Sequence, residues 1–191
     1  MAKIVVVTGT PGAGKSTVLN GAIEMLKNKV NVINYGDFMF EVAKQNGNVK
    51  NRDELRKLPS NEQITIQMAA ANQIVARAGK KITIVDTHST INTPLGYIPG
   101  MPEWVVTELK PMVIVLIEAD PKQIAKRRQK DKTRVRDKEA FEQIKAQQEL
   151  NRMFASSYAA MTGASVKIIV NADKKLSKAV GELASLINSL K

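Results

Sequence analysis

The stretch Gly9-Thr10-Pro11-Gly12-Ala13-Gly14-Lys15-Ser16 decides the fold, because it fits the phosphate-binding pattern G-x-x-x-x-G-K-[ST] at every fixed position. The apolar run before it, residues 4–8, predicts a buried strand of a parallel sheet. Apolar residues after it recur at the spacing of a helix. The glycines allow backbone N–H groups to surround an anion, and the positive end of the helix dipole adds to that attraction. A strand, a glycine-rich turn and a helix in this order are the context that the motif needs.

Two side chains of this motif have separate expected roles. The Lys15 ammonium is expected to reach the β- and γ-phosphates of ATP and to act in catalysis, and the Ser16 hydroxyl is expected to ligate Mg²⁺. We therefore predict that ATP binds to Gly9, Thr10, Pro11, Gly12, Ala13, Gly14, Lys15, Ser16 and Thr17. The alternative is a chance glycine-rich turn, and the agreement of motif and flanking pattern argues against it.

Length and composition narrow the class of protein. The 191 residues are enough for one domain with a sizeable core. The sequence has no cysteine, which excludes a disulfide framework and a thiolate metal site. No apolar run reaches about 18 residues, and the first residues lead directly into the strand at 4–8. We therefore expect no membrane span, no signal peptide and a cytoplasmic location.

The formal net charge of +11 is concentrated in one segment, because residues 126–138 hold eight basic and two acidic side chains. A basic surface over the whole molecule would favour nucleic acid. A local cluster in a chain with a phosphate-binding motif instead favours a clamp on phosphates, although a solvated helix face is the alternative for any single residue. Aromatic residues make up only 4% of the chain, and base stacking depends on them. Nucleic acid is therefore not expected as a partner.

Four further apolar runs predict strands at residues 30–35, 81–85, 112–117 and 165–170. Because helical patterns separate them, we expect an α/β fold with a five-stranded, mostly parallel sheet and helices on both faces. Asp37 is expected to cap the helix after the second strand, and Ser60 with Gln63 resembles a capping box. Residues 92–102, rich in proline and glycine, are expected to form a loop.

Asp86 directly follows the third apolar strand. Ligands of open α/β sheets bind at the carboxyl ends of the strands, where P-loop folds usually place a carboxylate that holds a Mg²⁺ water. Asp86 is therefore expected to bind the metal through water, with a helix cap or turn residue as the alternative. His88 is the only histidine, and an ordinary hydrogen-bonding role is expected for it.

Residues 34–39, 52–58, 86–90, 93–102, 134–137 and 162–167 carry a more specific signal than the phosphate-binding motif, which many NTPases share. With the motif, they make nearly the whole chain resemble a nucleoside monophosphate kinase, and most closely the archaeal type of adenylate kinase. The resemblance implies a single P-loop kinase domain over residues 1–191 with the strand order 2-3-1-4-5. It also implies an AMP-binding insertion at about residues 36–80 and a short lid, without zinc, at about residues 126–138.

The same resemblance implies reversible transfer of the ATP γ-phosphoryl group to AMP, which gives two ADP, with Mg²⁺ as the cofactor. Members of this type are commonly homotrimers. AMP is expected on the side of the second and third strands, with Asp37 and Arg56 as its binding residues; a guanidinium suits the AMP phosphate. Arg134, Arg136 and Arg152 are expected to act with Lys15 on the transferred group, and residues 171–173 to lie near the adenine of ATP.

Two other functions are compatible with the sequence. The first is another small-molecule or nucleotide kinase of the same fold, acting on CMP, UMP or a non-nucleotide. The second is an RNA-binding protein that uses ATP as a switch, which predicts a steep salt dependence of RNA affinity.

Overall fold

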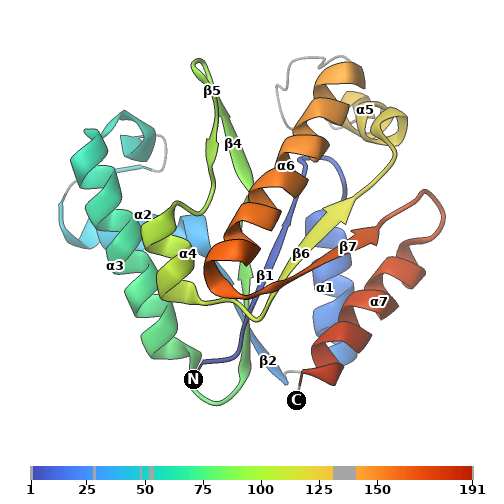
Figure 1. The fold of residues 1–191 in the computed structure, drawn as a ribbon, viewed down its shortest axis with the longest axis horizontal. Coiled ribbons are helices and arrows are strands. Elements are labelled where there is room, and N and C mark those ends of the chain that lie inside the picture. Colours follow the sequence, from blue (N-terminus) through green and yellow to red (C-terminus); the bar gives the residue numbers. More distant parts are fainter. Residues whose placement is uncertain (1, 28, 48, 52–53, 131–140, 191) are drawn as a thin grey trace.

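Five parallel strands form the centre of the computed structural model, which describes residues 2–27, 29–47, 49–51, 54–130 and 141–190 (Figure 1). They are β1 (Ile4–Gly9), β2 (Val30–Asn34), β3 (Ile82–Asp86), β6 (Val113–Glu118) and β7 (Ser165–Val170), in the spatial order β2-β3-β1-β6-β7. Counted along the chain among themselves, these strands have the expected order 2-3-1-4-5, which confirms the predicted fold. The order reverses between β1 and β6, so their carboxyl ends flank the crevice where ligands of open α/β sheets bind.

Helices cover both faces of the sheet, because alternate strand residues point to opposite sides (Figure 1). One face packs against α1 (Lys15–Leu26) and α7 (Leu176–Ser189) around Val5 and Val7. The other face, with Ile4 and Val6, packs against α2 (Tyr35–Gln45), α3 (Ser60–Ala78), α4 (Glu103–Leu109) and α6 (Phe141–Thr162). The short helix η1 (Glu54–Lys57) lies between α2 and α3 in sequence, and α5 (Pro121–Lys130) packs beside the turn after β1. Among the described residues, no helix is both long and apolar enough to cross a membrane.

The segment predicted as a loop, residues 92–102, instead contains most of a β-hairpin. Its strands β4 (Thr90–Thr93) and β5 (Gly96–Pro99) pair antiparallel, from Thr90 opposite Pro99 to Thr93 opposite Gly96. Gly96 has a φ of +112°, a conformation that glycine adopts without strain. Pro99 stands at the end of β5, which is an edge strand of this two-stranded sheet, and proline is tolerated in edge strands. Composition alone misses this hairpin because proline and glycine occupy the positions that a tight turn and a strand end allow.

Two predicted helix starts are also wrong in detail. Asn34, and not Asp37, caps α2, because the Asn34 side-chain oxygen accepts a hydrogen bond from the Asp37 backbone N–H at 3.1 Å. No capping box forms at α3, because Pro59 occupies the cap position and Ser60 already lies in the helix. The Gln63 amide instead donates to the Leu58 carbonyl at 2.8 Å.

Candidate active site

The phosphate-binding motif forms the turn between β1 and α1, as expected from the sequence. Gly12 and Gly14 have φ angles of +89° and +88°, which residues with a Cβ rarely adopt. A Cβ on Gly9 would lie 2.4 Å from the backbone oxygen of Ile117 in β6, so this strand contact also requires glycine. Residues 9–17 therefore run from the end of β1, through the glycine-rich turn, into the first turn of the 12-residue helix α1, and we call this stretch the P-loop.

The P-loop lysine lies against the carboxyl end of β3. Its Nζ donates to the Thr87 carbonyl at 2.8 Å and forms an ion pair with Asp86 Oδ1. Both side chains of the pair are mostly shielded, with 13% of Lys15 and 16% of Asp86 exposed. The sheet register explains this proximity, because Asp86 stands opposite Val7 of β1, two residues before the P-loop begins. Tertiary structure thus joins two residues that the sequence predicted separately.

The residues at this edge fit Mg²⁺ bound mainly by phosphates and water. Asp86 supplies carboxylate oxygens and Ser16, in the first turn of α1, supplies a hydroxyl; both are hard oxygen donors. In the part of the chain that the structure describes, no three His, Cys, Asp or Glu side chains gather as a metal site. Mg²⁺ usually keeps several waters and takes one or two carboxylates, so the available donors suit it.

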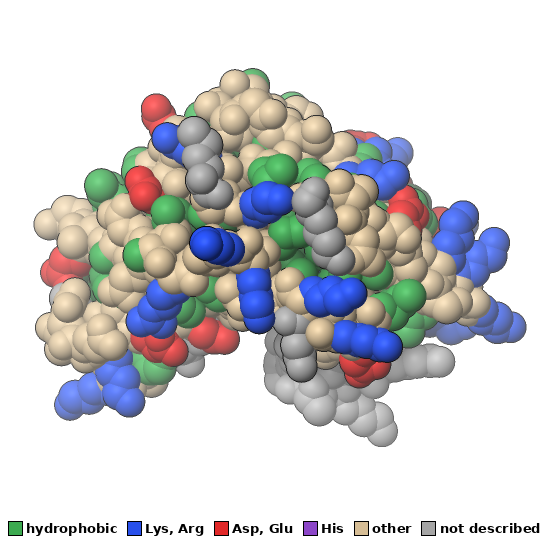
Figure 2. All heavy atoms as spheres, turned by 90° about the horizontal axis from the view of Figure 1, so that it is seen from below, with side chains coloured by type: hydrophobic (Ala, Val, Ile, Leu, Met, Phe, Trp, Pro, Cys, Tyr) green, Lys and Arg blue, Asp and Glu red, His purple; other side chains and the backbone are tan. Residues whose placement is uncertain are grey.

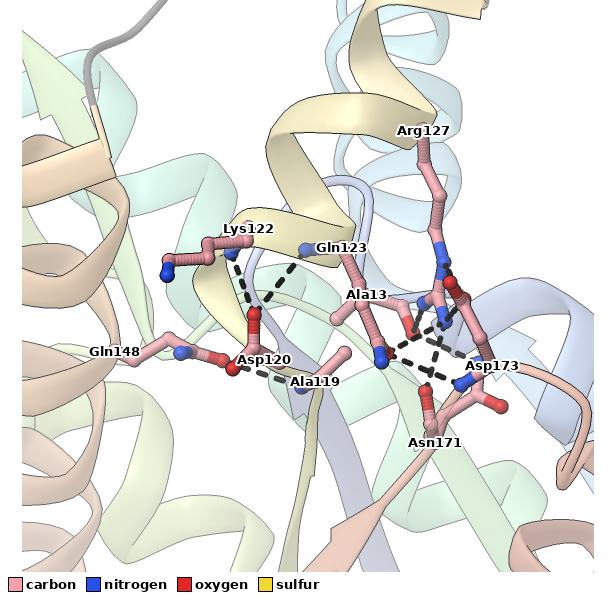
Figure 3. Close-up of polar contacts among 9 residues, drawn as sticks. All are labelled: Ala13, Ala119, Asp120, Lys122, Gln123, Arg127, Gln148, Asn171 and Asp173. Carbon is pink, nitrogen blue, oxygen red and sulfur yellow. Dashed lines mark hydrogen bonds and ion pairs between the residues drawn. The ribbon is translucent and has the colours of Figure 1, made fainter.

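Arg127 of α5 links the P-loop to the segment after β7 (Figure 3). Its guanidinium donates to the Ala13 carbonyl at 3.1 Å and the Asn171 carbonyl at 3.0 Å, and forms an ion pair with Asp173 at 2.5 Å. The Asn171 amide donates to the same Ala13 carbonyl at 2.9 Å. Residues 171 and 173 therefore lie beside the P-loop. The sequence pattern does not single out Arg127, because it is one of eight basic residues in 126–138.

The neighbouring Arg128 contacts the P-loop at Pro11, two residues before Ala13. Its Nε and Nη2 donate to the Pro11 carbonyl at 2.9 Å and 2.7 Å. Burial lowers the pKa of the Arg128 guanidinium, and the nearby Tyr97 partly opposes that effect. Two adjacent arginines of α5 thus hold backbone carbonyls of the P-loop.

Arg152, a predicted catalytic residue, lies at the same edge of the sheet and pairs with Glu118. Its Nε donates to Oε1 at 2.8 Å and its Nη2 to Oε2 at 2.5 Å, which is the two-point geometry that guanidinium favours with carboxylate. The hydrogen bond from Glu118 raises the pKa of Arg152, against the lowering effect of burial. The Glu118 side chain is only 6% exposed, whereas that of Arg152 is 52% exposed. Glu118, which the sequence pattern does not mark, therefore anchors an arginine that still faces solvent.

Asn151, next to Arg152 on α6, connects three parts of the site. Its amide donates to the Thr10 hydroxyl at 2.9 Å, and its side-chain oxygen accepts from the Thr90 hydroxyl at 2.7 Å. Two turns further along α6, the Tyr158 hydroxyl donates to the Ser89 carbonyl at 2.7 Å, and burial raises the pKa of Tyr158 to about 12. Helix α6 thus supports both the P-loop and the segment that follows Asp86.

Several predicted site residues cannot be placed in this way. Arg134 and Arg136 lie outside the described residues, as does most of the predicted lid at 126–138. The backbone of Arg56 belongs to η1, but its side chain is outside the described part. Asp37 lies in the first turn of α2. The lid, the insertion at 36–80 and the roles of these residues therefore stay predictions.

The Arg127 contacts carry a testable prediction. Replacing Arg127 with lysine should raise the KM for ATP by about ten-fold, because an ammonium cannot bridge the Ala13 and Asn171 carbonyls and Asp173 together. Steady-state kinetics at saturating acceptor would measure this change. Lys122 is the matched control, since it lies on the same helix with its side chain directed away from the network (Figure 3). The role of Arg127 in ATP binding would be contradicted if Arg127→Lys and Lys122→Ala had equal KM values for ATP.

The arrangement of sheet and site defines the class of protein. A P-loop after the first strand, with its lysine beside a carboxylate at the end of the adjacent strand, is the arrangement of the P-loop kinases. A family model described as an AAA domain matches residues 8–145. The structure resembles that of shikimate kinase from Acinetobacter baumannii in complex with shikimate, with a TM-score of 0.58, 16% identity and coverage of 100% of this chain and 96% of that chain. At this identity the likeness shows the fold alone.

Sequence comparison defines the family within that class. The adenylate kinase of Methanocaldococcus jannaschii is 50% identical over 188 residues, which cover 97% of this chain and 98% of the relative. The adenylate kinase of Methanopyrus kandleri is 50% identical over 192 residues, which cover all of both chains. The chain therefore belongs to the adenylate kinase family, and the predicted function as an adenylate kinase phosphotransferase is confirmed.

Proposed function

We propose that this protein catalyses reversible transfer of the γ-phosphoryl group of ATP to AMP, which gives two ADP, in the cytoplasm and with Mg²⁺ as cofactor. One observation carries the proposal. Lys15 of the P-loop stands beside Asp86 at the carboxyl edge of the sheet, at the N-terminus of α1, in a chain of the adenylate kinase family. This places a positive charge and an anion-binding helix end at one point.

On the donor side, the P-loop backbone and the N-terminus of α1 would bind the ATP phosphates, and Lys15 would move from Asp86 to the β- and γ-phosphates. Mg²⁺, when bound, supplies neutralisation of charge on the phosphate oxygens. Ser16 and Asp86 would hold it, Asp86 through a water. Arg127 would hold the P-loop and residues 171–173 in a fixed relative position, so that the adenine of ATP lies beside this segment.

On the acceptor side, β2 ends at Asn34 and leads directly into α2, so Asp37 stands near the carboxyl edge of the sheet on the opposite side of β3 from the P-loop. We place AMP on this side, with Asp37 and Arg56 as its binding residues. Arg152, with Arg134 and Arg136, would stabilise charge on the transferred group. Catalysis of this kind depends on positioning and charge neutralisation more than on covalent chemistry.

ADP formation from ATP with each nucleoside monophosphate in turn tests the proposed reaction. AMP should give the highest kcat/KM, and inorganic phosphate release without acceptor should be slow. A clear preference for CMP or UMP would instead identify another nucleotide kinase of the same fold. A preparation of the Lys15→Ala variant controls for contaminating kinases.

Arg56 offers a test of the acceptor side. If its guanidinium holds the AMP phosphate, Arg56→Lys should raise the KM for AMP by about ten-fold, because an ammonium does not reproduce two-point binding. The KM for ATP should change much less. Equal rises in both KM values would assign Arg56 a general structural role.

The described surface also bears on partners. On the face opposite the carboxyl edge of the sheet, Lys and Arg side chains are dispersed among neutral, hydrophobic and acidic ones (Figure 2). This pattern does not favour RNA at that face, since nucleic acid binding needs a continuous basic footprint.

We further propose that the protein is a homotrimer. Leu95 (100% exposed) and Ile98 (45%), both in the hairpin of β4 and β5, offer apolar surface for self-association. Light scattering should give three times the chain mass of 21.0 kDa.

A further inference from the structure

Asn34 makes two hydrogen bonds that join opposite sides of the site. Its side-chain oxygen accepts from the Asp37 N–H at 3.1 Å, and its Nδ2 donates to Asp86 Oδ2 at 3.1 Å. Only one orientation of the amide satisfies both contacts, because a carboxylate accepts and a backbone N–H donates. The other Asp86 oxygen, Oδ1, holds Lys15. A continuous polar chain therefore runs from the first turn of α2, through Asn34 and Asp86, to the P-loop lysine.

The sheet brings these groups together. Asn34 and Asp86 are register partners at the ends of β2 and β3, and Asp86 is in turn the partner of Val7 in β1. The contact between Asn34 and Asp86 spans 52 residues, so it depends on strand pairing and not on local sequence. Asn34 is neither fully buried nor fully exposed; its hydrogen bond to Asp86 is partly shielded from water, whereas the one from the Asp37 N–H is exposed.

Capping of α2 does not by itself require asparagine. Asparagine, aspartate and serine cap helices about equally well. Of these three, only asparagine can accept the Asp37 N–H while donating to a carboxylate. Aspartate would place a second negative charge next to Asp86, and serine is too short to make both contacts. The specific contribution of Asn34 is therefore the hydrogen bond that it donates to Asp86.

We propose that Asn34 is a positioning residue, which fixes Asp86 so that Lys15 can transfer from this carboxylate to the phosphates of ATP. The inference rests on the proposed binding of ATP at the P-loop. The hydrogen bond from Asn34 occupies one oxygen of Asp86 and so weakens the ion pair between Asp86 and Lys15. It also keeps the carboxylate in place when Lys15 moves to the phosphates. Because the same side chain caps α2, it links the start of this helix, on the predicted AMP side, to the carboxylate that binds the P-loop lysine.

Two variants separate positioning from capping. Asn34→Ser retains a helix cap and loses the donor to Asp86, whereas Asn34→Asp retains the cap and nearly the same shape but adds negative charge beside Asp86. ATP affinity is measured by isothermal titration calorimetry in EDTA, so that no metal contributes, together with kcat and both KM values in the presence of Mg²⁺. Thermal midpoints report on the cap, and AMP titration on the same preparation serves as an internal reference.

The expected order of ATP affinity is wild type, then Asn34→Ser, then Asn34→Asp, with a loss of about five-fold for serine and about twenty-fold or more for aspartate. AMP affinity and the thermal midpoints should change much less than ATP affinity. Wild-type ATP affinity and kcat in both variants would overturn the proposal, and so would equal losses for ATP and AMP that follow the thermal midpoint. Failure of the wild-type protein to bind ATP would instead overturn the proposed function.

Discussion

Replacing Lys15 with alanine is expected to lower kcat by about 100-fold or more, because it removes the positive charge that follows the transferred phosphoryl group. Lys15 is well placed for this role, since its Nζ lies at the carboxyl edge of the sheet, on Asp86 Oδ1 and the Thr87 carbonyl. The coupled assay of ADP formation measures the change. Wild-type turnover in a correctly folded variant would contradict the assignment of the P-loop as the ATP site.

A double variant separates catalysis from stability. Lys15→Ala leaves Asp86, 16% exposed, without its ionic partner, and an uncompensated charge in a shielded place is destabilising. Adding Asp86→Asn removes that charge. The thermal midpoint of the double variant should therefore recover toward the wild-type value, whereas kcat should stay at the level of Lys15→Ala or below. Recovery of activity together with the thermal midpoint would mean that the lysine acts through folding.

Replacing Gly100 with alanine is expected to lower the free energy of unfolding by about 3 kcal/mol or more. A Cβ at this position would lie 1.9 Å from the His88 backbone oxygen and 2.7 Å from the His88 carbonyl carbon. Backbone atoms cannot yield as a flexible side chain does, and the Gly100 N–H also donates to the Ser89 carbonyl at 2.8 Å. The distortion would reach the segment that directly follows Asp86.

The matched control is the same substitution at Gly181, inside α7. A Cβ there would meet nothing within 4 Å. Alanine is favoured over glycine in a helix interior, so Gly181→Ala should raise the free energy of unfolding by about 0.5–1 kcal/mol. Denaturant titration of both variants measures the two effects. Effects of the same sign and similar size would contradict the close approach of Gly100 to His88.

Features formed by neighbouring residues could be predicted from the sequence. The P-loop depends on glycines at fixed positions between an apolar run and a helical pattern, and its backbone geometry is set within those few residues. The strands β1, β3 and β6 were visible as apolar runs because burial on both faces of a parallel sheet demands continuous apolar sequence. The edge strands β2 and β7 are more exposed, but their residues are also mostly apolar. Further from the P-loop, the proline and glycine content of residues 92–102 led to the prediction of a loop where β4 and β5 form a hairpin. Composition does not indicate strand pairing.

The sequence by itself determined the fold class, the P-loop and the family of this protein. Only the tertiary structure decided which side chains surround the P-loop. Lys15 contacts Asp86, which is 71 residues away in sequence, and Arg127 contacts Ala13, which is 114 residues away. Each pair forms because sheet register and helix packing bring distant segments to one edge of the sheet. The cap of α2 is a local contact, because Asn34 and Asp37 are three residues apart, but sheet pairing places Asn34 at the end of β2 beside Asp86. Local periodicity reports which residues are buried, whereas the partner of a polar side chain depends on contacts that no local pattern contains.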